Sequence, residues 1–180
     1  MTDPRGFACS DTLRNGLAVT VRELRPDDRE RMATAIRKLD PESIYTRLFS
    51  HRTELTEAGL DRVMRVEPKD DVALVVTIGS GPDEIVIASG RCIGATAGKG
   101  ERTAEVAFVV EEDYHGLGIA SRLLRHLAQI ARDRGVAALE ADVLAENKPM
   151  LAVFAKSGLP MRKRREGGTV HVTLSLRAQG

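Results

Sequence analysis

A glycine-rich turn carries the most readable chemistry in this sequence. It runs from His115 to Ala120, has glycine at positions 116 and 118, and follows an apolar stretch typical of a strand. Such small residues let the backbone approach a ligand closely. The apolar period after the turn predicts a helix, whose first N–H groups and positive end would face an anion. We therefore predict a pyrophosphate site at this turn, with Arg122 and Arg125 as candidates for a further phosphate contact.

The same turn is compatible with structures other than a phosphate-binding loop. Glycines after a strand also form plain turns, so the motif alone leaves ligand binding open. A Walker loop would end in Gly-Lys-Ser or Gly-Lys-Thr, which is not the case here. A dinucleotide-binding fold would place its glycines after an early strand of a repeated βαβ pattern, whereas three strand-like runs precede this turn.

The elements that must position this turn follow from hydrophobic period and breaker residues. Strands are predicted over residues 18–22, 72–78, 84–93, 105–110 and 138–144, and a final hairpin turns at 166–168. Helices are predicted after Pro26, over about 41–49, from Thr56, from the glycine-rich turn to about Gly135, and over 148–157. Residues 1–17 are expected to form a flexible tail.

Composition excludes several classes of partner. The formal net charge is +1, aromatic residues make up 3% and tryptophan is absent, so we expect no nucleic-acid partner. Cys9 and Cys92 are too few for a disulfide framework and have no metal-ligand spacing, so we expect no metal site and a reducing cytoplasm. The longest apolar run, 72–78, is far shorter than the roughly 20 residues that cross a bilayer, and no secretory signal is evident. No membrane association is expected.

With its glycine-rich turn in this order of elements, the sequence resembles the GNAT superfamily of N-acetyltransferases over about residues 19–176. The family's loop pattern falls on His115, Gly118 and Ala120, its later asparagine on Asn147, and its Gly-Phe on residues 158–159, where this chain has Gly-Leu. The resemblance implies an α/β (α+β) GNAT-like fold over residues 18–177. Its central sheet would be mixed, mostly antiparallel, of about six to seven strands flanked by helices.

Within that superfamily, the sequence is similar to the acetyltransferase domain of bacterial Pat-type protein lysine acetyltransferases. The similarity lies in a Pro-Glu-Ser-x-Tyr-x-Arg helix at 41–49, an Ala-Glu-x-Ala strand at 104–107 and an Asn-x-x-Met at 147–150. It implies transfer of acetyl from acetyl-CoA to an amine, either a protein lysine or a small molecule. Tyr45 and Arg47 are then candidates for lining the acceptor cleft. The more common alternative is a purely structural role, with Tyr45 buried and Arg47 exposed on an amphipathic helix.

The resemblance also assigns a set of residues to the coenzyme. They come from the strand directly before the turn, from the turn and the start of the helix after it, and from the later helix and the residue before it. These residues are Phe108, Val109, Val110, His115, Gly116, Leu117, Gly118, Ile119, Ala120, Ser121, Asn147 and Phe154. A backbone N–H near Val109 or Val110 would stabilise the oxyanion of the tetrahedral intermediate. Asn147 would contact the pantetheine arm, or serve as a helix N-cap, or both.

Two carboxylates are candidates for the general base that removes a proton from the amine. Glu105 is the first choice and Asp142 the second, while the alternative for each is a solvated strand residue. Many relatives carry a tyrosine acid where this chain has Phe154, so we expect the thiolate to leave without that help, since a thiol has a pKa of about 8.5.

Three classes of function remain open from the sequence. An N-acetyltransferase with direct attack of the amine on acetyl-CoA is the leading hypothesis. A catalytically weak acyl-CoA sensor, favoured by Phe154, and a nucleotide-dependent enzyme are the alternatives. A monomer or a homodimer is expected.

Overall fold

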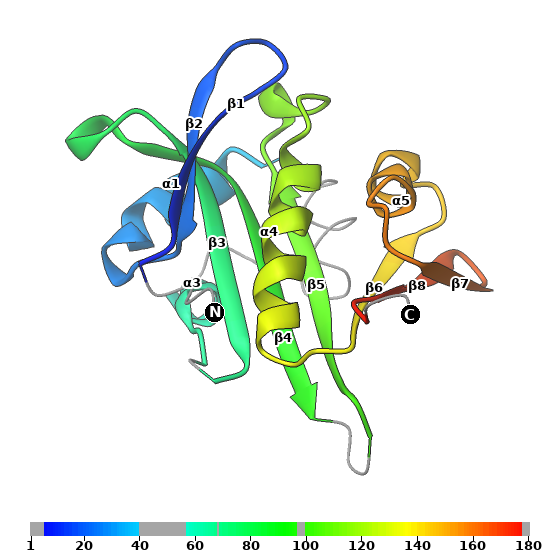
Figure 1. Ribbon diagram of the computed structural model, residues 1–180. Coiled ribbons are helices and arrows are strands. Elements are labelled where there is room, and N and C mark those ends of the chain that lie inside the picture. The colour runs from blue at the N-terminus through cyan, green and yellow to red at the C-terminus, as the bar shows by residue number, and fades with distance from the viewer. Residues whose placement is uncertain (1–5, 40–56, 68, 97–99, 178–180) are drawn as a thin grey trace.

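The fold is organised around one mixed sheet (Figure 1). The computed structural model describes residues 6–39, 57–67, 69–96 and 100–177, and within them the sheet has eight strands in the order β1-β2-β3-β4-β5-β6-β8-β7. Every neighbouring pair is antiparallel except β5 and β6, which are parallel. The strands are β1 (Ala8–Thr12), β2 (Ala18–Glu23), β3 (Asp71–Ile78), β4 (Ile85–Thr96), β5 (Arg102–Val110), β6 (Ala138–Leu144), β7 (Met161–Glu166) and β8 (Thr169–Ser175). The expected mixed, mostly antiparallel sheet is confirmed.

Strand β1 corrects the expectation that residues 1–17 form a flexible tail. Residues Ala8–Thr12 pair with β2 in antiparallel register, from Ala8 opposite Arg22 to Thr12 opposite Ala18. The next residue, Leu13, is buried in the main core. This edge strand contains Cys9, Asp11 and no continuous apolar run, so its pairing with β2 rather than its own hydrophobicity makes it a strand. It also raises the strand number above the expected six to seven.

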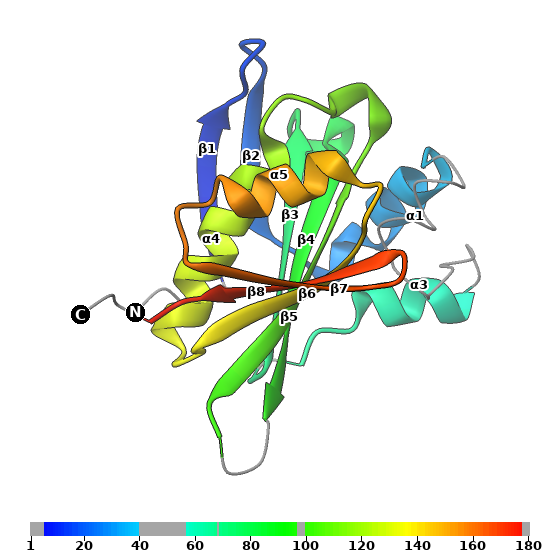
Figure 2. The same cartoon turned by 90° about the vertical axis from the view of Figure 1, so that its right-hand side faces the viewer.

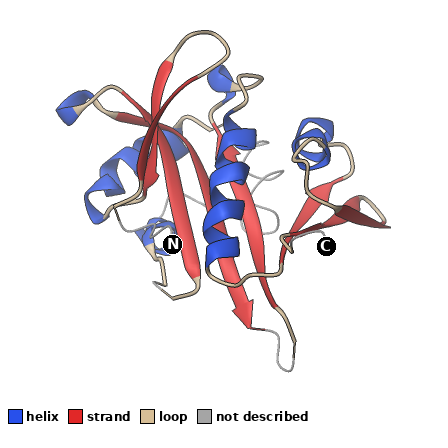
Figure 3. Ribbon diagram, in the orientation of Figure 1, coloured by secondary structure: helices blue, strands red, loops and turns tan. Residues whose placement is uncertain are grey.

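Helices cover both faces of the sheet (Figures 2 and 3). Helix α4 packs on β3, β4 and β5 with an apolar stripe that includes Leu123, Leu124 and Leu127, and helix α1 packs on β4 from the opposite side. None of the described helices is long and apolar enough to cross a membrane. The helix predicted over 41–49, with Tyr45 and Arg47, lies outside the described residues. The α-helices are α1 (Arg29–Arg37), α3 (Glu57–Met64), α4 (Ile119–Asp133) and α5 (Lys148–Ala155).

The parallel pair of β5 and β6 holds together over a short length only. Three positions pair, with Thr103 opposite Ala138, Ala104 opposite Leu139 and Glu105 opposite Glu140. Beyond them the two strands diverge, while β6 continues in register with β8 up to Leu144. Figure 1 shows β5 and β6 separating, with α5 beside the upper part of β6. The sheet therefore opens at its centre, immediately after Glu105.

Candidate acyl-coenzyme site

The glycine-rich turn joins the end of β5 to the first turn of α4. After β5 the chain makes a short 3-10 turn at Glu112–Tyr114, and α4 begins at Ile119. Gly116 and Gly118 have φ angles of 77° and 84°, a left-handed conformation that glycine adopts without steric cost. Gly118 is the N-cap residue and no side-chain hydrogen bond caps the helix start. The positive end of a 15-residue helix thus meets a turn of small residues.

His115 holds this turn to the end of β5. Its Nε2 atom lies 2.8 Å from the carbonyl oxygen of Val110, so the ring N–H donates to that oxygen. The side chain therefore stabilises the conformation of the turn, which is consistent with a loop that binds a ligand through its backbone.

A groove runs along the turn and is closed on its other side by α5. Its volume is about 340 Å³. Most of the residues assigned to the coenzyme from the turn line it, whereas Leu117 packs against the core instead. The described lining residues are Arg14, Val110, Tyr114, His115, Gly116, Gly118, Ile119, Ala120, Ser121, Asn147, Pro149, Met150, Ala152, Val153 and Lys156.

A smaller cavity of about 30 Å³ lies where β5 and β6 diverge. It is lined by Val106, Ala107, Phe108, Ala141, Asp142, Val143, Asn147, Met150 and Phe154. Asn147 and Met150 line both this cavity and the groove, so the two are adjacent along one path. The Oδ1 atom of Asn147 accepts a hydrogen bond from the Met150 N–H at 3.3 Å, which is the helix-capping role, and its side chain still borders both spaces.

Phe154 lies at the inner end of that path. Its side chain is 1% exposed, and its ring centroid is 6.2 Å from that of Phe108. The cavity that the two rings border is therefore largely apolar. Tyr114, whose phenol lies near the turn, has its pKa raised by burial and by the charges of Glu111 and Asp113.

The alternation of backbone N–H groups along β5 decides which of them face the opening. The Glu111 N–H donates to the Ile87 carbonyl oxygen on β4 at 2.9 Å. Because N–H groups alternate in direction along a strand, the Val109 N–H also faces β4, and those of Phe108 and Val110 face β6. Of the two donors expected from the sequence, Val110 is on the side of the opening and Val109 is not. The Val109 side chain instead borders a third cavity, on the opposite face of the sheet.

The two candidate bases have different surroundings. Glu105 is exposed at the last paired position of β5, next to Glu140, and no hydrogen bond or ion pair joins its side chain to another residue of the described chain. Asp142 accepts a hydrogen bond at 2.7 Å from Nδ1 of His171, which lies opposite it on β8. The Nε2 atom of His171 is 3.6 Å from a carboxylate oxygen of Glu140.

His171 is a partner of the candidate base Asp142 that the sequence did not reveal. A histidine in the last strand carries no motif of its own. The register of β6 and β8 places it against Asp142, and a residue opposite an acidic candidate is visible only once that register is known.

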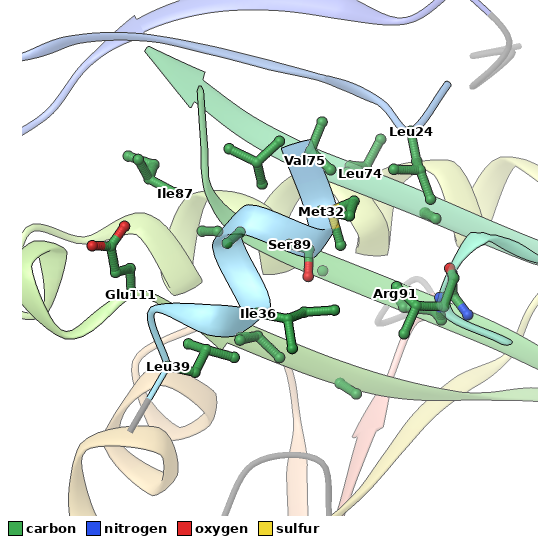
Figure 4. A pocket seen from close by; sticks show the side chains of 18 residues that line it. Leu24, Met32, Ile36, Leu39, Leu74, Val75, Ile87, Ser89, Arg91 and Glu111 are labelled. Carbon is green, nitrogen blue, oxygen red and sulfur yellow. The ribbon is translucent and has the colours of Figure 1, made fainter. Parts of the chain in front are cut away.

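The third cavity lies under α1 and α3, on the face of β5 opposite α4 (Figure 4). Its volume is about 130 Å³, and its wall is mostly aliphatic. Glu111 and Arg91 stand at opposite ends, with Ser89 between them. Burial lowers the pKa of Arg91, which donates to the backbone carbonyls of Arg62 and Val63.

Cys92 is one of two free cysteines in the described residues, and it is buried. Burial raises the pKa of Cys92 to about 12, so its thiol stays protonated and unreactive at neutral pH. No group of three or more His, Cys, Asp or Glu side chains in the described part of the chain is placed to hold a metal ion.

Comparison with known proteins agrees with this geometry. The model of the acetyltransferase (GNAT) family matches residues 40–159. An acetyltransferase of Pseudomonas aeruginosa is 29% identical over 140 residues, which cover 78% of this chain and 74% of that protein. The acetyltransferase Pat of Mycolicibacterium smegmatis is 34% identical over 147 residues, which cover 81% of this chain and 42% of Pat.

Solved structures add the likeness in three dimensions. The GNAT domain of S. lividans PAT has a TM-score of 0.82 at 32% identity, over 93% of this chain and 96% of that one. A cAMP-binding acyltransferase from Mycobacterium smegmatis has a TM-score of 0.63 at 29% identity, over 96% of this chain and 48% of that one. The chain thus spans less than half the length of Pat and of the cAMP-binding acyltransferase. The sheet that opens after Glu105, the turn before α4 and these matches together place the chain in the GNAT family of acetyltransferases.

Proposed function

We propose that this protein transfers the acetyl group of acetyl-CoA directly to an amine, with Glu105 as the general base. The observation that carries the proposal is the pair of cavities that share Asn147 and Met150, one at the turn with Gly116 and Gly118 and the other at the opening between β5 and β6. A pyrophosphate would bind at the turn, where N–H groups and the helix end favour an anion. The pantetheine arm would pass Asn147, and the thioester would lie beside Phe108.

The chemistry then follows from the groups around the opening. A lysine amine has a reference pKa of about 10.4, so it must lose a proton before it attacks the thioester carbonyl. Glu105 suits this role because its carboxylate is exposed and has no partner among the described residues, whereas Asp142 is already held by His171. An N–H of Phe108 or Val110 would stabilise the oxyanion, and the coenzyme would depart as a thiolate.

The acceptor is proposed to be an amine on a protein lysine or on a small molecule. The resemblance to Pat-type protein lysine acetyltransferases favours the lysine. The cavity under α1 and α3 supports an approach from that face, because its aliphatic wall suits the methylene chain of a lysine and includes Ala107 and Val109 of β5.

Acetyl transfer is expected to require the left-handed turn at Gly118. Valine there would be strained at a φ of 84°, and its Cβ would lie 2.5 Å from the Arg122 guanidinium. Gly118→Val should therefore abolish binding of acetyl-CoA in a calorimetric titration. Gly135→Val is the matched control, since Gly135 has a φ of 81° at the other end of α4, away from the groove.

The activity itself is measured as thiol release and product mass with acetyl-CoA against lysine peptides, free amines and amino acids. Turnover with any amine supports the enzyme. Binding of acetyl-CoA without turnover on the whole panel would favour the sensor, and binding of adenine nucleotides in preference to CoA would favour the nucleotide-dependent enzyme.

Restoring a hydroxyl at position 154 is expected to matter little. Phe154→Tyr should change kcat by only a few-fold, because a thiolate with a pKa of about 8.5 is already a stable leaving group near neutral pH. Steady-state kinetics at saturating acetyl-CoA measure this directly. If Tyr114→Phe instead removes most of the activity, a general acid operates from the turn and the prediction is wrong.

A further inference from the structure

The turn between β1 and β2 is a rigid part of the coenzyme groove. Backbone hydrogen bonds of 2.9 Å join Leu13 N to Leu17 O and Gly16 N to Leu13 O, and the Asn15 side chain accepts from the Leu17 N–H at 3.1 Å. The Leu13 side chain is 3% exposed. The intervening residue, Arg14, is therefore held at a defined place, and it lines the groove together with the glycine-rich turn.

Arg122 fastens this hairpin to the start of α4. Its Nε donates to Asp11 at 2.8 Å, one terminal nitrogen donates to Thr12 O at 3.0 Å, and the other donates to Gly118 O at 3.1 Å. All three guanidinium nitrogens are thus engaged by the protein. Arg122 is not among the described residues that line the groove, so we expect it to couple the hairpin to the turn rather than to bind a phosphate.

Arg14 has the properties that Arg122 lacks. One of its terminal nitrogens is 3.5 Å from the Gly116 carbonyl oxygen, and its Nε would be 3.6 Å from a Cβ built on Gly118. No carboxylate of the described residues forms an ion pair with Arg14, and none of the described residues that line the groove is acidic. Lys156 adds a second positive charge from the end of α5. The groove therefore presents two cations that form no ion pair with a described carboxylate, Arg14 beside the turn and Lys156 at the end of α5.

We infer that Arg14 is a phosphate-binding residue of the coenzyme site and contacts the pyrophosphate bound at the turn. The inference rests on the proposed function and adds the β1–β2 hairpin to the site. A guanidinium can donate two parallel hydrogen bonds to phosphate oxygens. Because the guanidinium is planar and the short turn holds the Arg14 backbone, little conformational freedom is lost on binding. In the proposed binding mode the pyrophosphate would lie at Gly116 and Gly118, and Arg14 is beside both.

The test is calorimetric titration of the whole chain with three probes. They are CoA, dephospho-CoA, which lacks the 3′-phosphate, and pantetheine, which lacks all phosphates. Arg14→Gln should lower the affinities for CoA and for dephospho-CoA by the same factor, about tenfold or more, as expected for the loss of a charged hydrogen bond. The affinity for pantetheine should not change. The loss should shrink as salt is added. Arg14→Lys should lose less.

Controls separate this inference from the proposed function. Arg164→Gln makes the same charge change on exposed β7, and it should bind CoA as the wild type does. At saturating acetyl-CoA, Arg14→Gln should keep kcat while its KM for acetyl-CoA rises. If the wild type binds CoA and Arg14→Gln binds CoA and dephospho-CoA as tightly as the wild type does, Arg14 is not a phosphate ligand. A loss for CoA alone would move Arg14 to the 3′-phosphate and overturn the pyrophosphate assignment. If the wild type does not bind CoA at all, the proposed function itself fails.

Discussion

Glu105→Gln is expected to lower kcat by about a hundredfold or more while leaving the affinity for acetyl-CoA unchanged. A general base contributes roughly this much, and glutamine keeps the shape of the side chain without accepting a proton. Glu105 stands at the last paired position of β5 and β6, where the sheet opens, and the next residue, Val106, lines the cavity in which the thioester is proposed to lie. Its carboxylate also has no partner among the described residues, which leaves it available to the amine.

The pH dependence distinguishes a lost base from a distorted site. Near neutral pH most of an amine with a pKa of about 10.4 is protonated, and its neutral fraction rises tenfold per pH unit. The activity of Glu105→Gln should therefore recover as the pH is raised, and the gap to the wild type should narrow. A gap that stays constant with pH would indicate a structural defect.

Asp142→Asn is the paired variant. Asp142 accepts a hydrogen bond from His171, and its carboxylate therefore serves first to orient that ring. We expect a loss of only a few-fold from Asp142→Asn. If its loss exceeds that of Glu105→Gln, the order of the two candidate bases is reversed, and the pair of Asp142 and His171 is the base system.

Asp28→Ala is expected to lower the free energy of unfolding by about 3–5 kcal/mol, the usual effect of removing one partner from a buried ion pair. Asp28 is fully buried and accepts hydrogen bonds from both terminal nitrogens of Arg22, at 2.8 and 2.7 Å, and from the Arg25 N–H at 2.7 Å. The Arg22 side chain is itself 3% exposed. Among the described residues, the Glu84 carboxylate and the Glu23 carbonyl oxygen would still contact Arg22, but alanine at position 28 removes the bidentate carboxylate from a buried positive charge.

Denaturation with urea measures this change, and Glu57→Gln is the control. Glu57 pairs with Arg29 at 2.7 Å, but its side chain is 90% exposed, so losing that pair should cost less than about 1 kcal/mol. Comparable effects of the two variants would mean that the buried pair is not a principal contributor to stability.

Acid titration gives a second check on Asp28. Burial raises its pKa, but the hydrogen bonds from Arg22 and Arg25 and the charges of Arg22 and Arg31 outweigh burial, so the pKa is held below its usual value. A group with a depressed pKa stabilises the fold above its unfolded pKa, about 3.9 for aspartate, and this stabilisation is lost as the pH falls toward the folded value. The stability of the wild type should therefore fall more steeply below about pH 4 than that of Asp28→Ala.

Features set by neighbouring residues could be predicted from the amino-acid sequence alone. The positive φ angles of the turn favour glycine, and the hydrophobic period of α4 is a property of one continuous segment. Both features therefore occur at the expected positions. Strand β6 occupies Ala138–Leu144, the predicted span, because its apolar alternation is strong and a glycine precedes it. The resemblance to the GNAT superfamily also rested on such local motifs.

Features that depend on pairing between distant residues were decided by the tertiary structure. Strand β1 exists because its polar residues pair with β2, and Arg14 reaches the turn because Arg122 ties that hairpin to α4, about a hundred residues further along the chain. The contact of His171 with Asp142 depends likewise on the register of β8 against β6. A single residue type says nothing about its partner across a sheet, since register is set by packing and pairing over the whole fold. The type of chemistry could therefore be predicted from the sequence, whereas the side chains that surround the candidate site were identified only from the tertiary structure.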